Sequence, residues 1–180
     1  MEVLKIAVGY LEANCYIIFD QKTKDAVVID PGGDAEEIIS KIIEGSLTPL
    51  VLINTHNHFD HIGANDEIKQ KFNIKIYHPK KDTEKDQEIK NFGSLKLKFF
   101  FTPGHTADGL CILIEDHLFS GDTLFANSIG RTDLDSGDFA QLINSIKTKI
   151  LTLPEKTIVH PGHGPDTTVE AEKKFNPFLK

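Results

Sequence analysis

Four short apolar runs in this sequence are each followed by a turn that carries histidine or aspartate side chains. The runs cover residues 50–53, 99–101, 117–121 and 157–160, and the last three lead through a glycine-containing turn to His105, Asp122 and His163. Binding and catalytic side chains are commonly placed on loops at the edge of a rigid scaffold. The pattern therefore predicts strands whose ends meet at one rim, where these side chains come together.

Strand-like and helix-like patterns alternate along the whole chain. Apolar residues at helical spacing predict helices over residues 34–45, with Asp34 as the N-cap, and over residues 62–72 and 139–150. The segment 78–90 is dense in charged residues and is expected to form a solvated loop or a short helix. Further short apolar runs predict strands at residues 3–8, 15–19, 26–29, 74–77, 95–101 and 110–115. Because both halves place strands before helices, the sequence predicts an α/β fold in which helices cover layers of sheet.

Length and composition predict a single globular domain over residues 1–180. The net charge of −7 gives no broad basic face, so we expect no nucleic-acid or anionic membrane partner. The sequence shows neither a membrane-span-length apolar run nor a signal-peptide pattern, which favours a cytoplasmic location. Cys15 and Cys111 lie beside apolar residues and are interpreted as small core side chains. The oligomeric state is left open.

The segment from Thr55 to Gly63 carries three imidazoles and a carboxylate within six positions, a donor density that fits a divalent metal such as Zn²⁺. His56 and His58 are two residues apart, so on an extended chain both side chains leave on the same side and can share one ion. Asp60 and His61 fall at the start of the next helix and suit a second ion. A structural role for Asp60 as that helix's N-cap remains an alternative that could coexist with ligation.

The eight histidines of the sequence divide into two sets. Any single histidine in a turn is more often structural than functional, but five of them fall in the donor pattern together. The other three are expected to lie at the surface or to support the donors without binding metal themselves: His78, His117 and His160.

The segment 55–63 resembles the His-x-His-x-Asp-His signature of the metallo-β-lactamase superfamily. His105, Asp122 and His163 match the remaining metal positions of that superfamily in order, and residues 28–33 resemble its early aspartate turn. Residues 119–125, 129–134, 161–168 and 176–179 are similar to the short bacterial glyoxalase II-like hydrolases.

The resemblance implies an αββα sandwich with the metal site at one edge between the sheets. It assigns one ion to His56, His58 and His105, and a second ion to Asp60, His61 and His163, with Asp122 as the bridge. An aspartate at the bridging position argues against the antibiotic-hydrolysing subclass that has a cysteine there. The implied cofactors are two divalent metal ions, most readily Zn²⁺, with Fe²⁺ and Mn²⁺ as alternatives.

Two cations that share a water lower its pKa from 15.7 toward roughly 7, so a bridging hydroxide is available as the nucleophile at neutral pH. Asp60 is expected to orient that hydroxide while it binds metal. A thiolate leaves readily because its conjugate acid has a pKa near 8.5. We therefore expect a metallohydrolase that cleaves a small acyl thioester similar to S-lactoylglutathione.

Substrate contacts are expected in the loop after the bridging aspartate. Arg131 is the only arginine of the chain, and in glyoxalase II relatives this loop supplies a basic contact to the carboxylate of the thiol carrier. An ion pair of Arg131 with Asp133 or Asp138 is the alternative. The remaining residues expected at the mouth of the site are Phe125, Asn127 and Ile129. The C-terminal helical domain that supplies much of the glutathione site in full-length glyoxalase II is not expected here, so the sequence leaves the thiol carrier open.

Three other functions stay possible at this point. A mononuclear iron persulfide dioxygenase would use the positions of His56, His105 and Asp122, and its sequences share the element at residues 130–133. The continuation of His163 by Gly164 and Pro165 favours the hydrolase instead. A lactonase or phosphodiesterase could use the same scaffold, and a metal-binding protein without catalysis is the third possibility.

Overall fold

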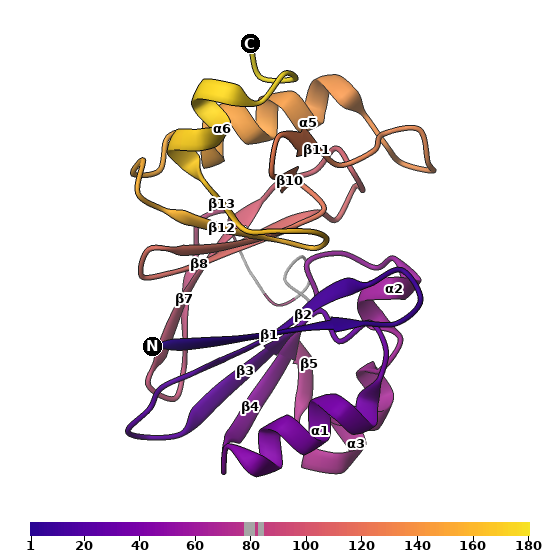
Figure 1. Cartoon of the computed structure of the whole chain (residues 1–180), viewed down its shortest axis with the longest axis vertical. Helices are drawn as coiled ribbons and strands as arrows, with labels where there is room; N and C mark the ends of the chain where they lie inside the picture. The colour runs from indigo at the N-terminus through magenta and orange to yellow at the C-terminus, as the bar shows by residue number, and fades with distance from the viewer. Residues whose placement is uncertain (78–81, 83–84) are drawn as a thin grey trace.

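The strands of the computed structural model, which describes residues 1–77, 82 and 85–180, form two sheets that face each other (Figure 1). The first sheet has the order β1 (Glu2–Val8), β2 (Ala13–Phe19), β3 (Asp25–Ile29), β4 (Thr48–Ile53) and β5 (Lys75–Tyr77). The second has the order β13 (Thr167–Thr168), β12 (Ile158–Pro161), β9 (His117–Gly121), β8 (Leu110–Ile114), β7 (Leu95–Phe101) and β6 (Ile89–Phe92). The strands β10 (Leu124–Phe125) and β11 (Ser128–Ile129) form a short separate ribbon. Both large sheets are mixed, because β3, β4 and β5 pair in parallel in the first and β12 pairs in parallel with β9 in the second.

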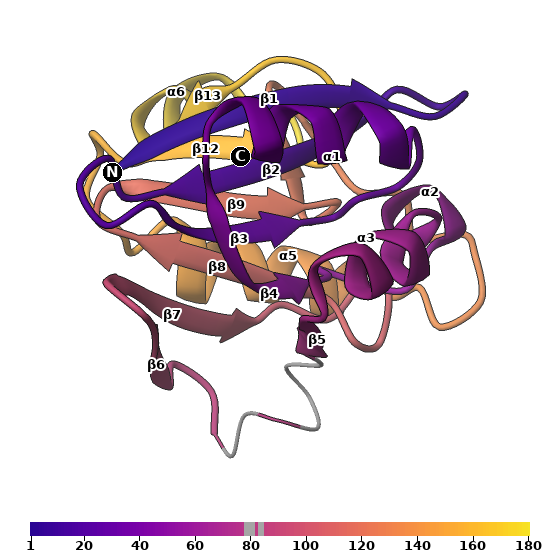
Figure 2. The same cartoon turned by 90° about the horizontal axis from the view of Figure 1, so that it is seen from below.

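Helices cover the outer face of each sheet (Figures 1 and 2). The first sheet carries α1 (Ala35–Glu44) and α3 (Asn65–Phe72), with the short helix α2 (Phe59–Ile62) near one edge. The second carries α5 (Phe139–Ser145), which continues as the π-helical turn η1 (Ile146–Ile150), and α6 (Val169–Phe175). This arrangement confirms the αββα sandwich. Among the described helices there is none with the length and apolarity that a bilayer span requires.

Side chains that point alternately to the two faces of each strand form three apolar clusters, one outside each sheet and one between the sheets. Cys15 and Ile17 of β2 pack outward in the cluster that includes α1, whereas Tyr16 and Ile18 pack inward between the sheets. In the second sheet, Phe99 of β7 lies between the sheets, and the next residue, Phe100, packs outward against α5 and η1. Because successive side chains of a strand point to opposite faces, nearly every position of a central strand in such a sandwich is apolar.

Strand direction brings the donor-bearing loops to one edge. β7 and β9 are both antiparallel to β8 and therefore run in the same direction, which β12 shares because it pairs in parallel with β9. Their carboxyl ends lead to His105, Asp122 and His163 in turn. The same edge receives the end of β4, where the histidine-rich segment begins. The prediction that these strand ends meet at one rim is confirmed.

Several expected elements differ in the structure. The predicted helix over residues 62–72 is wrong in its extent, because the chain forms α2 from Phe59 and breaks at Gly63 before α3 begins. A side chain at Gly63 would meet the carbonyl oxygen of Gly32 at 2.3 Å, so the break accompanies a close backbone approach. The N-cap of α2 is His58, and Asp60 lies in the first turn of that helix, so the N-cap alternative for Asp60 is wrong.

Other differences lie at the sheet edges and near the C-terminus. Residues 89–90, expected in a charged loop, begin the edge strand β6, and the sequence analysis did not predict β13 or α6. Asp34 is the N-cap of α1, but its carboxylate accepts the N–H of Gly9 at 2.7 Å and makes no hydrogen bond to the helix. The expectations for His78 and for residues 79–81, 83 and 84 fall outside the described residues.

Cys15 and Cys111 are free and fully buried, as expected for small core side chains. Burial raises the pKa of the Cys111 thiol to about 11, so at neutral pH this side chain is an uncharged thiol.

Candidate metal centre

The seven predicted metal donors lie in two adjoining groups at the edge where both sheets end. The first group comes from the loop after β4, the loop after β7 and the end of β9: His56, His58, His105 and Asp122. The second comes from α2 and the loop after β12: Asp60, His61 and His163. Within each group the ligand atoms lie within 4.8 Å of one another.

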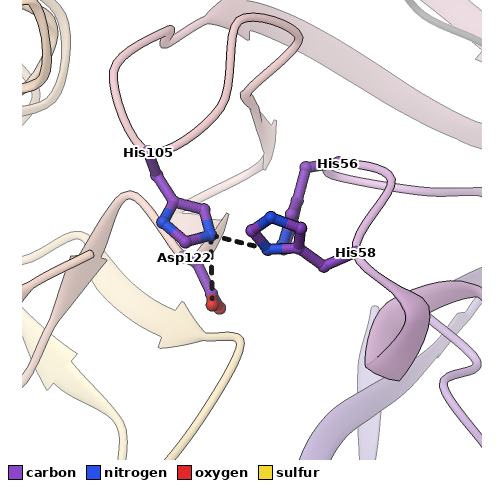
Figure 3. Close-up of side chains that lie close together, drawn as sticks. All are labelled: His56, His58, His105 and Asp122. Atoms are coloured by element: carbon purple, nitrogen blue, oxygen red, sulfur yellow. Dashed lines mark hydrogen bonds and ion pairs between the residues drawn. The ribbon is translucent and has the colours of Figure 1, made fainter. Parts of the chain in front are cut away.

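Three ring nitrogens and one carboxylate oxygen of the first group face one point (Figure 3). His58 Nδ1 lies 3.1 Å from His56 Nε2 and 3.0 Å from His105 Nε2. His105 Nε2 lies 3.5 Å from Asp122 Oδ2. A tetrahedral ion with metal–nitrogen distances of about 2.0–2.1 Å holds its ligands about 3.4 Å apart. The spacing therefore fits a single ion with little rearrangement.

The second group adjoins the first through Asp122. His163 Nε2 lies 3.2 Å from Asp60 Oδ2, and His61 Nε2 lies 3.7 Å from the same oxygen. Asp122 places Oδ1 3.4 Å from His61 Nε2 and Oδ2 3.8 Å from His163 Nε2. One carboxylate thus faces both groups, which is the arrangement a bridging ligand requires.

Four of the histidine rings are oriented by a hydrogen bond from Nδ1, the outer ring nitrogen that faces away from the centre, to a protein oxygen. The pairs are His56 Nδ1 with Thr55 Oγ1, His61 Nδ1 with Asp30 Oδ2, His105 Nδ1 with the Arg131 carbonyl, and His163 Nδ1 with the Leu11 carbonyl, at 2.8–3.2 Å. Carboxylate and carbonyl oxygens only accept, and the Thr55 hydroxyl already donates to Asp30. Each outer nitrogen therefore carries the proton, and in the neutral ring the Nε2 lone pair faces the centre.

A cation fits this set of facing acceptors. His61 Nε2 and Asp122 Oδ1 are buried with no hydrogen-bond partner, an arrangement that costs free energy unless a positive charge lies between them. Burial lowers the pKa of His61, but its hydrogen bond to Asp30 and the charges of Asp30, Asp122 and Asp60 outweigh burial and raise that pKa to about 9. Burial and the neighbouring imidazoles hold the pKa of His56 well below its usual value. A cation that binds His61 Nε2 would displace the proton that the raised pKa places there, and the imidazoles and carboxylates would then be donors suited to Zn²⁺, Fe²⁺ or Mn²⁺.

Asp30 is a supporting residue to which the sequence analysis assigned no role. Its side chain accepts the Thr55 N–H at 2.7 Å and the Thr55 hydroxyl at 2.6 Å, in addition to the ring of His61. These three donors use both carboxylate oxygens, so Asp30 orients a donor rather than offering itself to an ion. The signal in the sequence was the aspartate turn over residues 28–33, which was noted there only as a point of resemblance.

Gly162 shows why the loop before His163 needs a residue without a side chain. A Cβ at this position would lie 2.2 Å from Asp122 Oδ1 and 2.8 Å from His61 Cε1. Any substitution there would push directly against the carboxylate of Asp122.

The residues predicted to contact the substrate differ in their exposure and in their distance from the donors. The ring of Phe125 lies 6.4 Å from that of His163, centroid to centroid. Ile129 is 8% exposed and packs in the outer cluster of the second sheet, so its side chain offers little surface to a substrate. Asn127 is exposed and its backbone N–H donates to the carboxylate of Glu172.

Arg131 forms the ion pair with Asp133 that the sequence left open as an alternative to a substrate contact. Its guanidinium donates two hydrogen bonds of 2.8 Å to the carboxylate of Asp133, and both side chains are exposed. Asp138 instead caps α5 by accepting the N–H of Gln141. The backbone carbonyl of Arg131 orients His105, so this residue supports the centre through its main chain.

The remaining described histidines lie along β9 and β12. His160 is 5% exposed, stacks on Phe119, and bonds to His117 at 2.8 Å and to Asp166 at 2.9 Å. His160 is therefore a buried polar residue of the sandwich, so of the two positions expected for it the surface one is excluded, whereas His117 is partly exposed.

Comparison with known proteins agrees with this site. A family model described as the metallo-beta-lactamase superfamily matches residues 8–88 and 82–163. The chain is 37% identical to the probable metallo-hydrolase YqgX of Bacillus subtilis, covering 99% of this chain and 98% of the relative. It is 34% identical to the hydroxyacylglutathione hydrolase GloC of Haemophilus influenzae, with the same coverage of each.

Solved structures show the same similarity. The crystal structure of the BLEG-1 B3 metallo-beta-lactamase superposes with a TM-score of 0.93 at 39% identity, covering 99% of this chain and all of that one. The structure of TTHA1623 in a di-iron-bound form superposes with a TM-score of 0.87 at 31% identity, covering 98% and 100%. The family match over most of the chain, together with relatives of 34–37% identity over nearly its whole length, shows that this chain belongs to the metallo-beta-lactamase superfamily.

Proposed function

We propose that this metal-dependent hydrolase cleaves small acyl thioesters at a centre of two divalent ions. The observation that carries the proposal is the pair of donor groups joined by one carboxylate at an accessible edge. Asp122 and Asp60 are 12% and 14% exposed, and His163 is 29% exposed, so water and a small substrate can reach this side of the centre.

Two bound divalent ions supply a water of lowered pKa and a Lewis acid for the acyl oxygen. The chain supplies the rest of the chemistry. Asp60, whose Oδ2 lies 3.2 Å from His163 Nε2, would help to hold the second ion and would orient the water that this ion supplies. A thiolate leaves without a protein acid because the thiol pKa is about 8.5, which explains why no further acid is needed for a thioester.

Similarity supports the substrate class. GloC, the relative at 34% identity, carries the name of a hydroxyacylglutathione hydrolase, an enzyme that acts on a thioester. The metal is proposed as Zn²⁺, with Fe²⁺ or Mn²⁺ as alternatives, because the same donors accept all three and the similar TTHA1623 structure is described as di-iron-bound.

Arg131 is proposed as an anchor for a carboxylate on the thiol carrier. The guanidinium is held by Asp133 in an exposed ion pair, and such pairs are weak because water solvates both partners. A substrate carboxylate can therefore replace Asp133 in the same two-bond geometry.

The test combines metal analysis with activity measurements on purified protein. We expect about two metal ions per chain and hydrolysis of S-lactoylglutathione or a smaller acyl thioester. Asp60→Asn should reduce kcat by about 100-fold or more. The control is Asp66→Asn, which changes an exposed carboxylate of α3 in the same way and should retain activity.

Other outcomes would replace the proposal. One iron per chain with oxygen uptake on glutathione persulfide would identify a persulfide dioxygenase. Faster turnover of a lactone, a phosphodiester or a chromogenic cephalosporin than of any thioester would change the substrate class. Two bound metals with no turnover in any of these assays would favour a metal-binding protein without catalysis.

A further inference from the structure

The loop that carries His163 is held from across the sandwich. His163 follows β12 of the second sheet, yet the backbone on both sides of it is bound by residues of the first sheet. Its immediate neighbour Gly162 is also tied to its own sheet, through an N–H that donates to the Gly121 carbonyl at 2.9 Å. The position of His163 therefore depends on how the two sheets are joined here.

Asn14, at the start of β2, makes most of these contacts. Its backbone N–H donates to the Gly162 carbonyl at 2.7 Å. Its side-chain amide donates to the Pro161 carbonyl at 2.8 Å and to the Gly164 carbonyl at 3.1 Å. With 3% exposure, Asn14 makes these bonds away from water, where each has a larger effect than at the surface.

Other residues of the hairpin formed by β1 and β2 complete the attachment. Leu11, in the turn of the hairpin, accepts the ring N–H of His163 at 3.2 Å. Lys5 donates to the Gly164 carbonyl at 2.7 Å, and the Tyr16 hydroxyl donates to the Pro161 carbonyl at 2.7 Å. The backbone on either side of His163 and the ring of His163 are thus both held by one hairpin.

The first donor group is supported differently. The ring of His105 is oriented by the Arg131 carbonyl, and that of His56 by its neighbour Thr55. Neither contact involves a residue of the hairpin. A change in the hairpin should therefore affect the second group selectively.

We propose that Asn14 is a positioning residue for the second donor group and that the hairpin of β1 and β2 sets the affinity of this group for its cation. Asn14 touches neither the cation nor the substrate in this proposal; it fixes the loop from Pro161 to Gly164 so that His163 Nε2 faces Asp60. The inference rests on the metal-binding part of the proposed function. Loss of a partner that orients a metal ligand typically weakens metal affinity by about 10–100-fold.

The test is a stepwise titration of chelator-treated protein with Co²⁺, followed by absorbance and by competition with a chelator. His163→Ala identifies the step that belongs to the second group, and His105→Ala identifies the other. Asn14→Ala should weaken Co²⁺ binding at the second donor group by about 10–100-fold and leave binding at the first donor group within about 3-fold. Asn176→Ala is the control, because it removes another buried asparagine whose amide donates to a backbone carbonyl, that of Ser128, outside the hairpin; both steps should stay within about 3-fold.

Three results would overturn the inference. Unchanged affinity at the second group in Asn14→Ala would show that the loop keeps its place without this residue. Equal weakening of both steps would show a general structural role. If Asn14→Ala does not fold, Asn14→Ser leaves a smaller cavity while it removes the amide that donates to both Pro161 and Gly164, and unchanged affinity in that variant would then overturn the inference. A wild-type protein that binds no second cation would instead refute the proposed function itself, and this inference with it.

Discussion

Replacing Asp30 with asparagine tests how the second donor group is built. The buried carboxylate accepts three hydrogen bonds, from the N–H and hydroxyl of Thr55 and from the ring of His61. An amide of the same shape can accept at one atom only. The Thr55 N–H cannot change its role, so it retains the amide oxygen, and the NH₂ group is left facing the Thr55 hydroxyl and His61 Nδ1.

This exchange reverses the hydrogen bond to His61. Nδ1 must now accept, so in the neutral ring the proton moves to Nε2, the atom that faces Asp122 at 3.4 Å. A protonated nitrogen has no lone pair for a cation. We expect the affinity of the second group for metal to fall by about 10–100-fold, which is about 1.4–2.7 kcal/mol. Because hydrogen bonds to a charged group contribute about 1.5–3 kcal/mol each, we also expect the metal-free protein to lose about 2–4 kcal/mol of unfolding free energy.

Both quantities are measurable on the same preparations. Urea unfolding of the metal-free protein gives the free energy, and a chelator competition gives the metal affinity. Asp34→Asn is the matched control, because Asp34 also accepts a backbone N–H, from Gly9, but lies at an exposed position of the next turn. Wild-type metal affinity in Asp30→Asn, with stability within about 1 kcal/mol, would refute the reasoning.

Three further outcomes are expected. Arg131→Ala should raise KM for carboxylate-bearing thioesters and leave neutral ones unchanged, whereas Asp133→Asn should lower it; equal effects on both substrate classes would remove the anchoring role. Glu172→Ala should cost about 3–5 kcal/mol in urea unfolding, because the buried carboxylate accepts hydrogen bonds from Asn127, Thr167 and Asn176 that would lose their acceptor; a loss below about 1 kcal/mol would contradict this. In the metal-free protein the pKa of His61 is raised from 6.5 to about 9, so the stability that His61 contributes should be present near pH 6.5 and be lost as the pH rises through 9; a flat profile of unfolding free energy between pH 6.5 and 9 would show that His61 is not charged in the folded state.

The strands and the donor residues were readable from the sequence for a physical reason. Central strands of this sandwich are apolar on both faces, so they stand out as short continuous apolar runs such as residues 50–53 and 110–114. The helix over residues 62–72 was placed wrongly because apolar periodicity continues across Gly63, while the break is imposed by the approach of Gly32 from another turn. The strand β6 and the helix α6 expose much of their length, which leaves a weak apolar pattern.

The sequence by itself determined which side chains could bind metal, because imidazole and carboxylate donors at the ends of apolar strands are visible without coordinates. Spacing and resemblance also indicated how these donors divide into two groups, whereas only the tertiary structure decided what orients them, such as the burial of His61 against Asp30. Asp30, Asn14 and the carbonyl of Leu11 act on donors distant in sequence: Asp30 lies 31 residues from His61, and Leu11 lies 152 from His163. Contacts across such separations depend on how the sheets pack, and no local pattern of residues encodes them.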